Sequence, residues 1–290
     1  MTWVMSVLGG VLVLTALWDV FHTLWNPSGQ GPVSRLTMRG VWWVSRHLGT
    51  GGGRLSGPAA MVLVIASWAA LVAVGWALIY WPHVPGEFTY SPGLAPDERS
   101  NFLDALYLSV VVVATLGLGD IVPDAAVLRL LVPLEALLGF ALLTAAVSWV
   151  LQIYPALTRR RALALRPKAV HRAGTIDVLP QMEPHTAARI ISELADGVSH
   201  VYVDLLQYSE TYYFHDANPR STLARSLPYG LELADGAQRS RSPDVRHAGT
   251  VLRDVLEDLA DVLDEQFLST GLDTAGVLDA YRRDQSTPSS

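Results

Sequence analysis

The chain contains no cysteine, which excludes disulfide bonds and metal sites built from thiolates. It also lacks the G-x-G-x-x-G pattern of a nucleotide-binding regulatory domain. Its 290 residues show no Ser/His/Asp constellation, phosphate-binding loop or complete set of metal ligands. We therefore expect a protein that is not an enzyme and that holds no cofactor.

Charge is missing from particular places as well. No acidic residue occurs between residues 26 and 58, and no apolar stretch carries the arginine at every third position that a voltage-sensor helix needs. Steep voltage gating is therefore not expected. The formal net charge of −6 is spread over both halves of the chain and identifies no partner, and we expect no nucleic acid binding.

Half of the residues are apolar, and three stretches reach the roughly 20 residues that cross a lipid bilayer. They are Trp3–Trp25, Ala59–Trp81 and Ala125–Tyr154. A cleaved signal peptide is the alternative for the first stretch. No basic residue precedes that stretch and no small-residue cleavage site follows it, so we expect a retained helix.

The distribution of charge predicts the topology. The link between the first two stretches and the segment after the third are basic, whereas residues 82–124 are acidic. The arginines are Arg35, Arg39, Arg46 and Arg54 in the link and Arg159–Arg161 after the third stretch. Because basic loops stay in the cytoplasm, we expect a multi-pass protein of the plasma (inner) membrane with its amino terminus outside.

A shorter apolar segment, residues 101–114, lies between the second and third stretches. Asn101 and Asp104 form an N-terminal capping pattern, and about 13 helical residues cover roughly 20 Å, enough to reach the middle of a membrane. We predict a re-entrant pore helix. The partial negative charge at its C-terminal end stabilises a cation at the membrane centre.

The loop that follows, residues 115–120, reads TLGLGD. Gly117 and Gly119 permit the left-handed backbone that turns successive carbonyls toward one axis. Four such loops would stack rings of carbonyl oxygens, with a ring of Thr115 hydroxyls at the inner end, in place of the water around a monovalent cation. One loop per chain requires four chains, so we expect a homotetramer.

The segment FLDALYLSVVVVATLGLGDIVP resembles the pore loop of the potassium channel family, whose filter usually reads T-V-G-Y-G-D, and the resemblance covers residues 59 to about 153. It implies K⁺ as the permeant ion. The residues whose carbonyl oxygens bind K⁺ are then Thr115, Leu116, Gly117 and Leu118, and those at the outer mouth are Gly119 and Asp120.

The surroundings of the filter depart from the family pattern. Leu118 lacks the phenol hydroxyl of the usual tyrosine, and Val111 stands where some members carry a carboxylate. Tyr107 and Leu108 occupy positions that often hold tryptophan. A weakly selective monovalent cation channel is therefore one alternative. A non-conducting receptor or scaffold that uses the pore module for tetramerisation is the other.

The third stretch is expected to be the pore-lining inner helix. The resemblance makes Gly139 a gating hinge, and close helix packing is the alternative. Val147 and Leu151 are predicted to form a hydrophobic constriction, because closing four helices there would dewet the path. Glu135 either bonds the back of the filter or faces the cavity, where it attracts cations and internal blockers.

Asp19 and His22 lie three residues apart near the cytoplasmic end of the first stretch. We favour a polar helix end packed against the basic linker, and a proton sensor is the alternative. Residues 33–48 of that linker mix arginines with valine and tryptophan, and are expected to lie along the inner membrane surface.

After Pro155 the chain alternates charged and aliphatic residues, and helices are predicted at residues 185–215, 219–236, 246–269 and 273–284. An apolar seam is expected to pack within this domain or between subunits. Its residues are Leu252, Leu256, Leu259, Leu263 and Phe267. One helix face is predicted to carry His200, Asp204, Tyr208 and Tyr212, which recur every four residues. His200 and Asp204 have metal-ligand spacing, but we favour an exposed or interface stripe. An unknown cytoplasmic regulator is expected to act here and gate the pore.

The predicted fold class is an all-α membrane protein with three transmembrane helices, a re-entrant pore helix and filter loop, and a C-terminal helical cytoplasmic domain. Its parts are an additional N-terminal transmembrane helix (1–25), a basic cytoplasmic linker with an interfacial helix (26–58), the pore module (59–154) and the cytoplasmic domain (155–290). Within the pore module lie the pore helix (101–114), the filter (115–120) and the inner helix (125–154).

Overall fold

The computed structural model describes residues 2–25, 31–47, 56–94, 100–214 and 222–286. The described residues are mostly helical, which confirms the predicted fold class, and three helices are long and apolar enough to cross a membrane. These are Trp3–Trp25, Gly57–His83 and Leu128–Arg172. The contacts divide the chain into a first unit, Met1–Val41 with Ala59–Leu151, and a second unit, Trp42–Pro58 with Gln152–Ser290.

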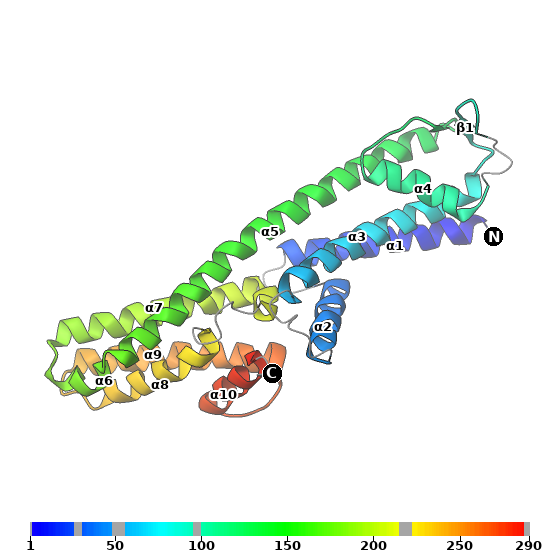
Figure 1. The fold of residues 1–290 in the computed structure, drawn as a ribbon. Coiled ribbons are helices and arrows are strands. Elements are labelled where there is room, and N and C mark those ends of the chain that lie inside the picture. The colour runs from blue at the N-terminus through cyan, green and yellow to red at the C-terminus, as the bar shows by residue number, and fades with distance from the viewer. Residues whose placement is uncertain (1, 26–30, 48–55, 95–99, 215–221, 287–290) are drawn as a thin grey trace. The chain divides into compact units, whose positions relative to one another are not determined.

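The first unit contains the apolar helices (Figure 1). Its elements are α1 (Thr2–Trp25), the first part of α2 (Pro32–His47), α3 (Ser56–Tyr80), the short η2 turn (Trp81–His83), α4 (Phe102–Val113) and the first part of α5 (Leu128–Arg172). Helices α1 and α3 approach backbone to backbone, since a Cβ on Gly75 would lie 2.8 Å from the Gly9 carbonyl oxygen. Small residues at a helix crossing are typical of packing inside membranes.

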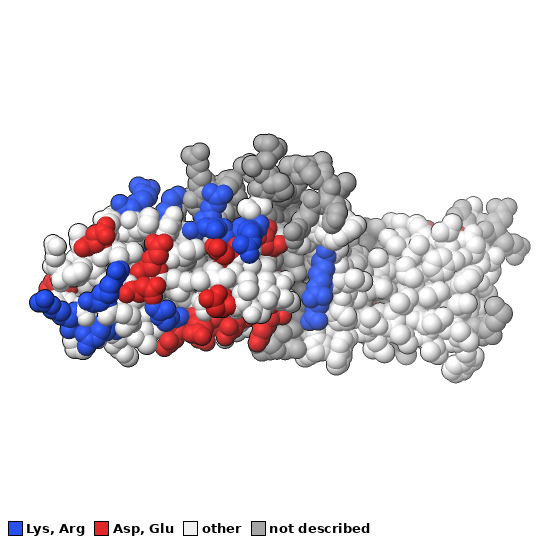
Figure 2. Space-filling view, turned by 90° about the horizontal axis from the view of Figure 1, so that it is seen from below, with Lys and Arg blue, Asp and Glu red and all other residues white. Residues whose placement is uncertain are grey.

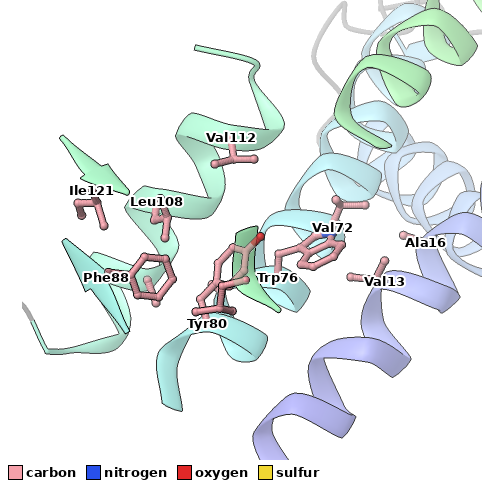
Figure 3. Close-up of a cluster of buried hydrophobic side chains, with 12 residues drawn as sticks. Val13, Ala16, Val72, Trp76, Tyr80, Phe88, Leu108, Val112 and Ile121 are labelled. Carbon is pink, nitrogen blue, oxygen red and sulfur yellow. The ribbon is translucent and has the colours of Figure 1, made fainter. Parts of the chain in front are cut away.

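A short antiparallel strand pair, β1 (Phe88–Tyr90) and β2 (Ile121–Pro123), flanks α4 and the loop that follows it. The sequence did not predict it, because three-residue strands carry too little pattern. A hydrophobic core joins these strands to α1, α3 and α4, and Figure 3 shows Tyr80 and Phe88 next to Leu108 of α4. The core therefore holds α4 against α3 and the strand pair.

Helix α5 differs from the prediction at both ends. It begins at Leu128 rather than near residue 125, and it continues to Arg172, beyond the expected end at Tyr154. Pro155 does not end it. A proline inside a helix removes one backbone hydrogen bond, and the buried side chains of Ile153 and Leu157 on either side of it stabilise the continuous helix.

The second unit is a group of helices. Besides the rest of α5 it contains α6 (Thr175–Val178), η4 (Leu179–Gln181), α7 (Pro184–Gln207), η5 (Ser209–Tyr213), α8 (Leu223–Gln238), α9 (Pro243–Leu263), the π-helical turn η7 (Asp264–Leu268) and α10 (Thr274–Gln285). The helix predicted at residues 185–215 ends at Gln207, because Tyr208 leaves the helical conformation. The first residues of the helix predicted at 219–236 lie outside the described residues.

The two units differ in surface charge. In Figure 2 acidic and basic side chains gather on the second unit, whereas the visible face of the first unit is almost free of them. A part of the chain that is embedded in a membrane requires such a charge-poor surface.

The leucine seam of α9 is buried within its own unit, through Leu252, Leu256, Leu259 and Leu263. The seam therefore packs inside the domain.

Candidate functional site: the pore loop and its supports

Helix α4 has the length and the cap expected of a pore helix. Asn101 Oδ1 accepts a hydrogen bond from the Asp104 backbone N–H at 3.1 Å, and Asp104 Oδ2 accepts one from the Asn101 N–H at 3.4 Å. This reciprocal capping box satisfies two backbone donors at the helix start. The 12 residues from Phe102 to Val113 cover roughly 18 Å, which is shorter than the bilayer core.

The backbone of the loop alternates in handedness. Thr115, Gly117 and Gly119 have φ values of +56°, +54° and +74°, and no other residue between them has a positive φ. This is the alternation that turning successive carbonyls to one side requires. Thr115 was not expected to be left-handed, and a side chain in that region costs of order 1 kcal/mol or more, a strain that is common at functional sites.

In the single chain the loop is open to its surroundings. Leu116 and Leu118 are 63% and 60% exposed, and a Cβ on Gly117 or Gly119 would meet no atom within 4 Å. The inner end of the loop is tied to α4, since the N–H groups of Thr115 and Leu116 donate to α4 carbonyls at 2.8 and 2.9 Å. Large exposed apolar side chains beside open backbone are typical of a surface that another subunit covers.

The outer end of the loop is tied down through Asp120. The Tyr107 hydroxyl of α4 donates to Asp120 Oδ2 at 2.6 Å, and the Ser91 N–H donates to the Asp120 carbonyl at 2.9 Å. Sequence reasoning noted Tyr107 only as a departure from tryptophan and missed this bond. A phenol also carries an O–H donor, so it can hold the aspartate as an indole N–H would.

Glu135 is fully buried behind the pore helix. Its two carboxylate oxygens accept hydrogen bonds from the Tyr80 hydroxyl of α3 at 2.6 Å and the Ser109 hydroxyl of α4 at 2.5 Å. The Ser109 Oγ also lies 2.9 Å from the Ala73 carbonyl oxygen. Glu135 thus connects three helices of one chain, which agrees with a role in supporting the filter rather than with a side chain in the cavity.

Gly139 lies where α5 crosses the end of the pore helix. A Cβ at this position would overlap the carbonyl oxygen of Val113 and lie 3.0 Å from its Cα. This geometry agrees with the packing interpretation of the glycine. Farther along the helix, Val147 and Leu151 are exposed in the single chain, as are Phe140 and Leu143. They belong to an apolar face of α5 that its own chain leaves uncovered.

Asp19 of α1 is a fully buried carboxylate that holds the start of α2. It accepts from the Val33 N–H at 2.7 Å, from the Ser34 N–H and hydroxyl at 3.1 and 2.5 Å, and from Trp68 Nε1 of α3 at 2.7 Å. Trp68 in turn packs against Trp149 of α5, with ring centroids 5.3 Å apart. His22 instead lies against Trp18. The geometry agrees with a polar helix end packed on the linker.

The prediction of an exposed stripe in the second unit was wrong for Asp204 and Tyr212, which are buried and make internal contacts. Arg159 donates to both carboxylate oxygens of Asp204 at 2.7 and 2.6 Å, so Asp204 is engaged by arginine rather than by His200. The Tyr212 hydroxyl donates to Asp284 at 2.5 Å, and burial together with this carboxylate raises the pKa of Tyr212. Among the described residues, no group of three or more metal-ligating side chains comes together.

Comparison with known proteins concerns the segment that contains this loop. Residues 59–154 match the ion channel family. This ion-channel segment covers one third of the chain and contains α4, the loop and the first part of α5. The matched family consists of channels rather than enzymes. The match to this family indicates an oligomer in the membrane.

A curated relative adds a second finding. The chain is 30% identical over 179 residues to an uncharacterized membrane protein of Bacillus subtilis (strain 168), YdjJ, with 58% of this chain and 50% of the relative covered. The chain therefore spans about half the length of this relative. No solved structure matches the chain. Together with the three apolar helices, these matches identify a multi-pass membrane protein, one segment of which is similar to the ion channel family.

Proposed function

We propose that four copies of this chain form a potassium-selective channel, in which K⁺ passes through rings of carbonyl oxygens. The ligand residues are Thr115, Leu116, Gly117 and Leu118, with Gly119 and Asp120 at the outer mouth. The observation that carries this proposal is the alternation of positive φ at residues 115, 117 and 119, after a capped half-membrane helix. Carbonyl rings of this kind replace the hydration shell of the ion.

Two exposed surfaces of the single chain support the proposed tetramer. One chain supplies one loop, whose leucines are exposed among the described residues, and one α5 helix with an exposed apolar face. Three further copies around an axis cover both surfaces and close the ring. The α5 face that contains Val147 and Leu151 then lines the inner path, where apolar side chains close it by excluding water.

The cytoplasmic domain is the proposed regulator of this path. Helix α5 runs without interruption from Leu128 to Arg172, so its residues belong to both units. A change in the second unit can therefore act directly on the inner helix. We propose that an unidentified cytoplasmic partner drives such a change, and that Gly139 serves packing against α4 more than bending.

Purified protein in lipid vesicles tests conduction. We expect uptake of K⁺ or Rb⁺ by vesicles with the parent chain and none with Gly117→Ala, because alanine is disfavoured at a φ of +54°. Gly10→Ala is the matched control, since its added Cβ meets no atom within 4 Å and its backbone is helical. No flux from the parent chain under any stimulus would favour a scaffold.

Weak selectivity is the second candidate, and a specific observation favours it. Leu118 has no hydroxyl and is 60% exposed, so the middle of the loop lacks the hydrogen bond that a tyrosine makes. The Tyr107–Asp120 bond holds the outer end instead. Flux of Na⁺ equal to that of K⁺ would favour this alternative over potassium selectivity.

A further inference from the structure

Helix α2 has two different faces. One face is buried in the first unit through Ser34 and Met38. The first turn of α2 is hydrogen-bonded to the Asp19 carboxylate. The other face is open, with Leu36 75% exposed and Trp43 61% exposed. Large apolar side chains on an open helix face indicate contact with another molecule or a membrane.

The open face combines this apolar line with positive charge. Leu36 and Trp43 are seven residues apart, so they lie on one line along the helix. Arg35 and Arg39 form a second exposed line beside it. Residues 26–58 contain arginines and no acidic residue, so this segment carries net positive charge. An apolar line flanked by arginines is the pattern of a helix that lies in the headgroup region of a membrane.

The position of α2 in the chain places it at a membrane surface. Six residues separate the end of α1 at Trp25 from Pro32, and a chain of that length reaches at most about 20 to 25 Å. The bonds to Asp19 restrict it further. Asp19 lies six residues, or roughly 9 Å, inside the end of α1. The start of α2 is therefore held at the level of the end of the first apolar helix.

We propose that α2 binds anionic phospholipid at the cytoplasmic membrane surface. Arg35 and Arg39 bind the phosphate groups, and Leu36 and Trp43 insert between the headgroups and the acyl chains. Guanidinium groups suit this role because they donate two parallel hydrogen bonds to phosphate. The proposal goes beyond conduction. It depends on the multi-pass topology and not on the ion that passes.

Because the chain has no cysteine, a single spin label can be placed on this face. Leu36→Cys and, separately, Trp43→Cys are labelled with a nitroxide in the full chain. The chain is reconstituted in phosphatidylcholine, with or without phosphatidylglycerol. Collision with oxygen reports an apolar environment, and collision with a water-soluble nickel chelate reports water. We expect both labels to favour oxygen when phosphatidylglycerol is present, and a label at Val251→Cys on the exposed side of α9 to stay accessible to nickel.

Charge removal tests the role of the arginines. Each basic residue near an anionic surface contributes about fivefold to binding, so Arg35→Gln with Arg39→Gln reduces the ratio of inserted to free α2 by about 25-fold. The exposed pair Arg225→Gln with Arg239→Gln, in the second unit, is the matched control and leaves the ratio unchanged. Free inorganic phosphate leaves both labels unchanged if the membrane is the binding partner.

Three results would overturn the proposal. Labels that prefer the nickel chelate in every lipid mixture place α2 in water. Labels shielded from both reagents indicate that protein, such as a second copy, covers this face. An unchanged ratio in the Arg35 and Arg39 variant shows that charge does not hold the helix. None of these results depends on flux, so the lipid proposal and the channel proposal can fail separately.

Discussion

Replacing Asp19 removes the acceptor that anchors α2 to the transmembrane helices. In Asp19→Ala, three buried donors and one part-buried donor lose their partner: the Ser34 N–H and hydroxyl, the Trp68 indole N–H and, part-buried, the Val33 N–H. In Asp19→Asn, an amide oxygen in the place of Oδ2 keeps three of these bonds, and the Val33 N–H then faces an NH₂ group. The two variants therefore form a graded series.

The expected cost follows from the number of donors left without a partner. A buried donor that loses its acceptor costs about 1 to 3 kcal/mol. We expect Asp19→Asn to lower the free energy of unfolding by about 1 to 2 kcal/mol. With some relaxation and entry of water, Asp19→Ala should cost at least about 3 kcal/mol. If the loss is confined to α2, the same energy appears as an increase of more than about 100-fold in local opening.

Amide hydrogen exchange over residues 31–38 measures that opening in detergent or vesicles, and chemical unfolding followed by tryptophan fluorescence measures the global loss. Asp254→Ala is the control, because Asp254 is exposed on α9. Exchange and unfolding in Asp19→Ala that match the parent chain would refute the role assigned to Asp19. So would an effect as large in the Asp254 variant.

Three further predictions concern the pore loop. Tyr107→Phe removes the hydroxyl bonded to Asp120, and we expect the K⁺ to Na⁺ permeability ratio to fall several-fold, in line with about 1 kcal/mol for one hydrogen bond, while the fold persists. Glu135→Gln keeps the size of a buried side chain outside the cavity, so conductance and polyamine block should match the parent channel. Gly139→Ala forces the end of α4 away from α5 at Val113 and should lower stability by about 1 to 3 kcal/mol in thermal unfolding.

Each of these predictions has an opposing result. A Tyr107→Phe channel with unchanged ion ratios would show that the Asp120 bond does not control the filter. Reduced polyamine block in Glu135→Gln would place that carboxylate in the cavity. A Gly139→Ala protein as stable as the parent, but with altered opening, would restore the hinge interpretation. Gly10→Ala serves as the control for the last variant.

The local features of the pore segment could be predicted because their causes lie close together in the sequence. The cap of α4 depends on Asn101 and Asp104, three residues apart, and the handedness of the loop depends on alternating glycines. The membrane stretches follow from composition alone. The predicted end of this helix at Tyr154 was wrong. Whether α5 continues past Pro155 depends on packing between residues that lie far apart in the chain.

The supports of the site depend on distant partners, and no pattern in one sequence reveals them. Asp19 binds residues 14, 15 and 49 positions away, and Glu135 binds partners 26 and 55 positions away. Sequence reasoning identified both carboxylates as unusual. It favoured packing against the linker for Asp19 and left two roles open for Glu135. The bond between Tyr107 and Asp120 could have been predicted. Tyr107 carries a hydroxyl donor on α4, thirteen residues before the carboxylate of Asp120, which can accept its hydrogen bond.

The reversal potential of the reconstituted protein between K⁺ on one side and Na⁺ on the other tests the central claim most directly. If the carbonyls of residues 115–118 select K⁺, the current reverses close to the potassium equilibrium potential, and Gly117→Ala abolishes the current while Gly10→Ala does not. A reversal at zero with equal concentrations of the two cations, or a current that Gly117→Ala leaves intact, would contradict a potassium-selective filter at this loop.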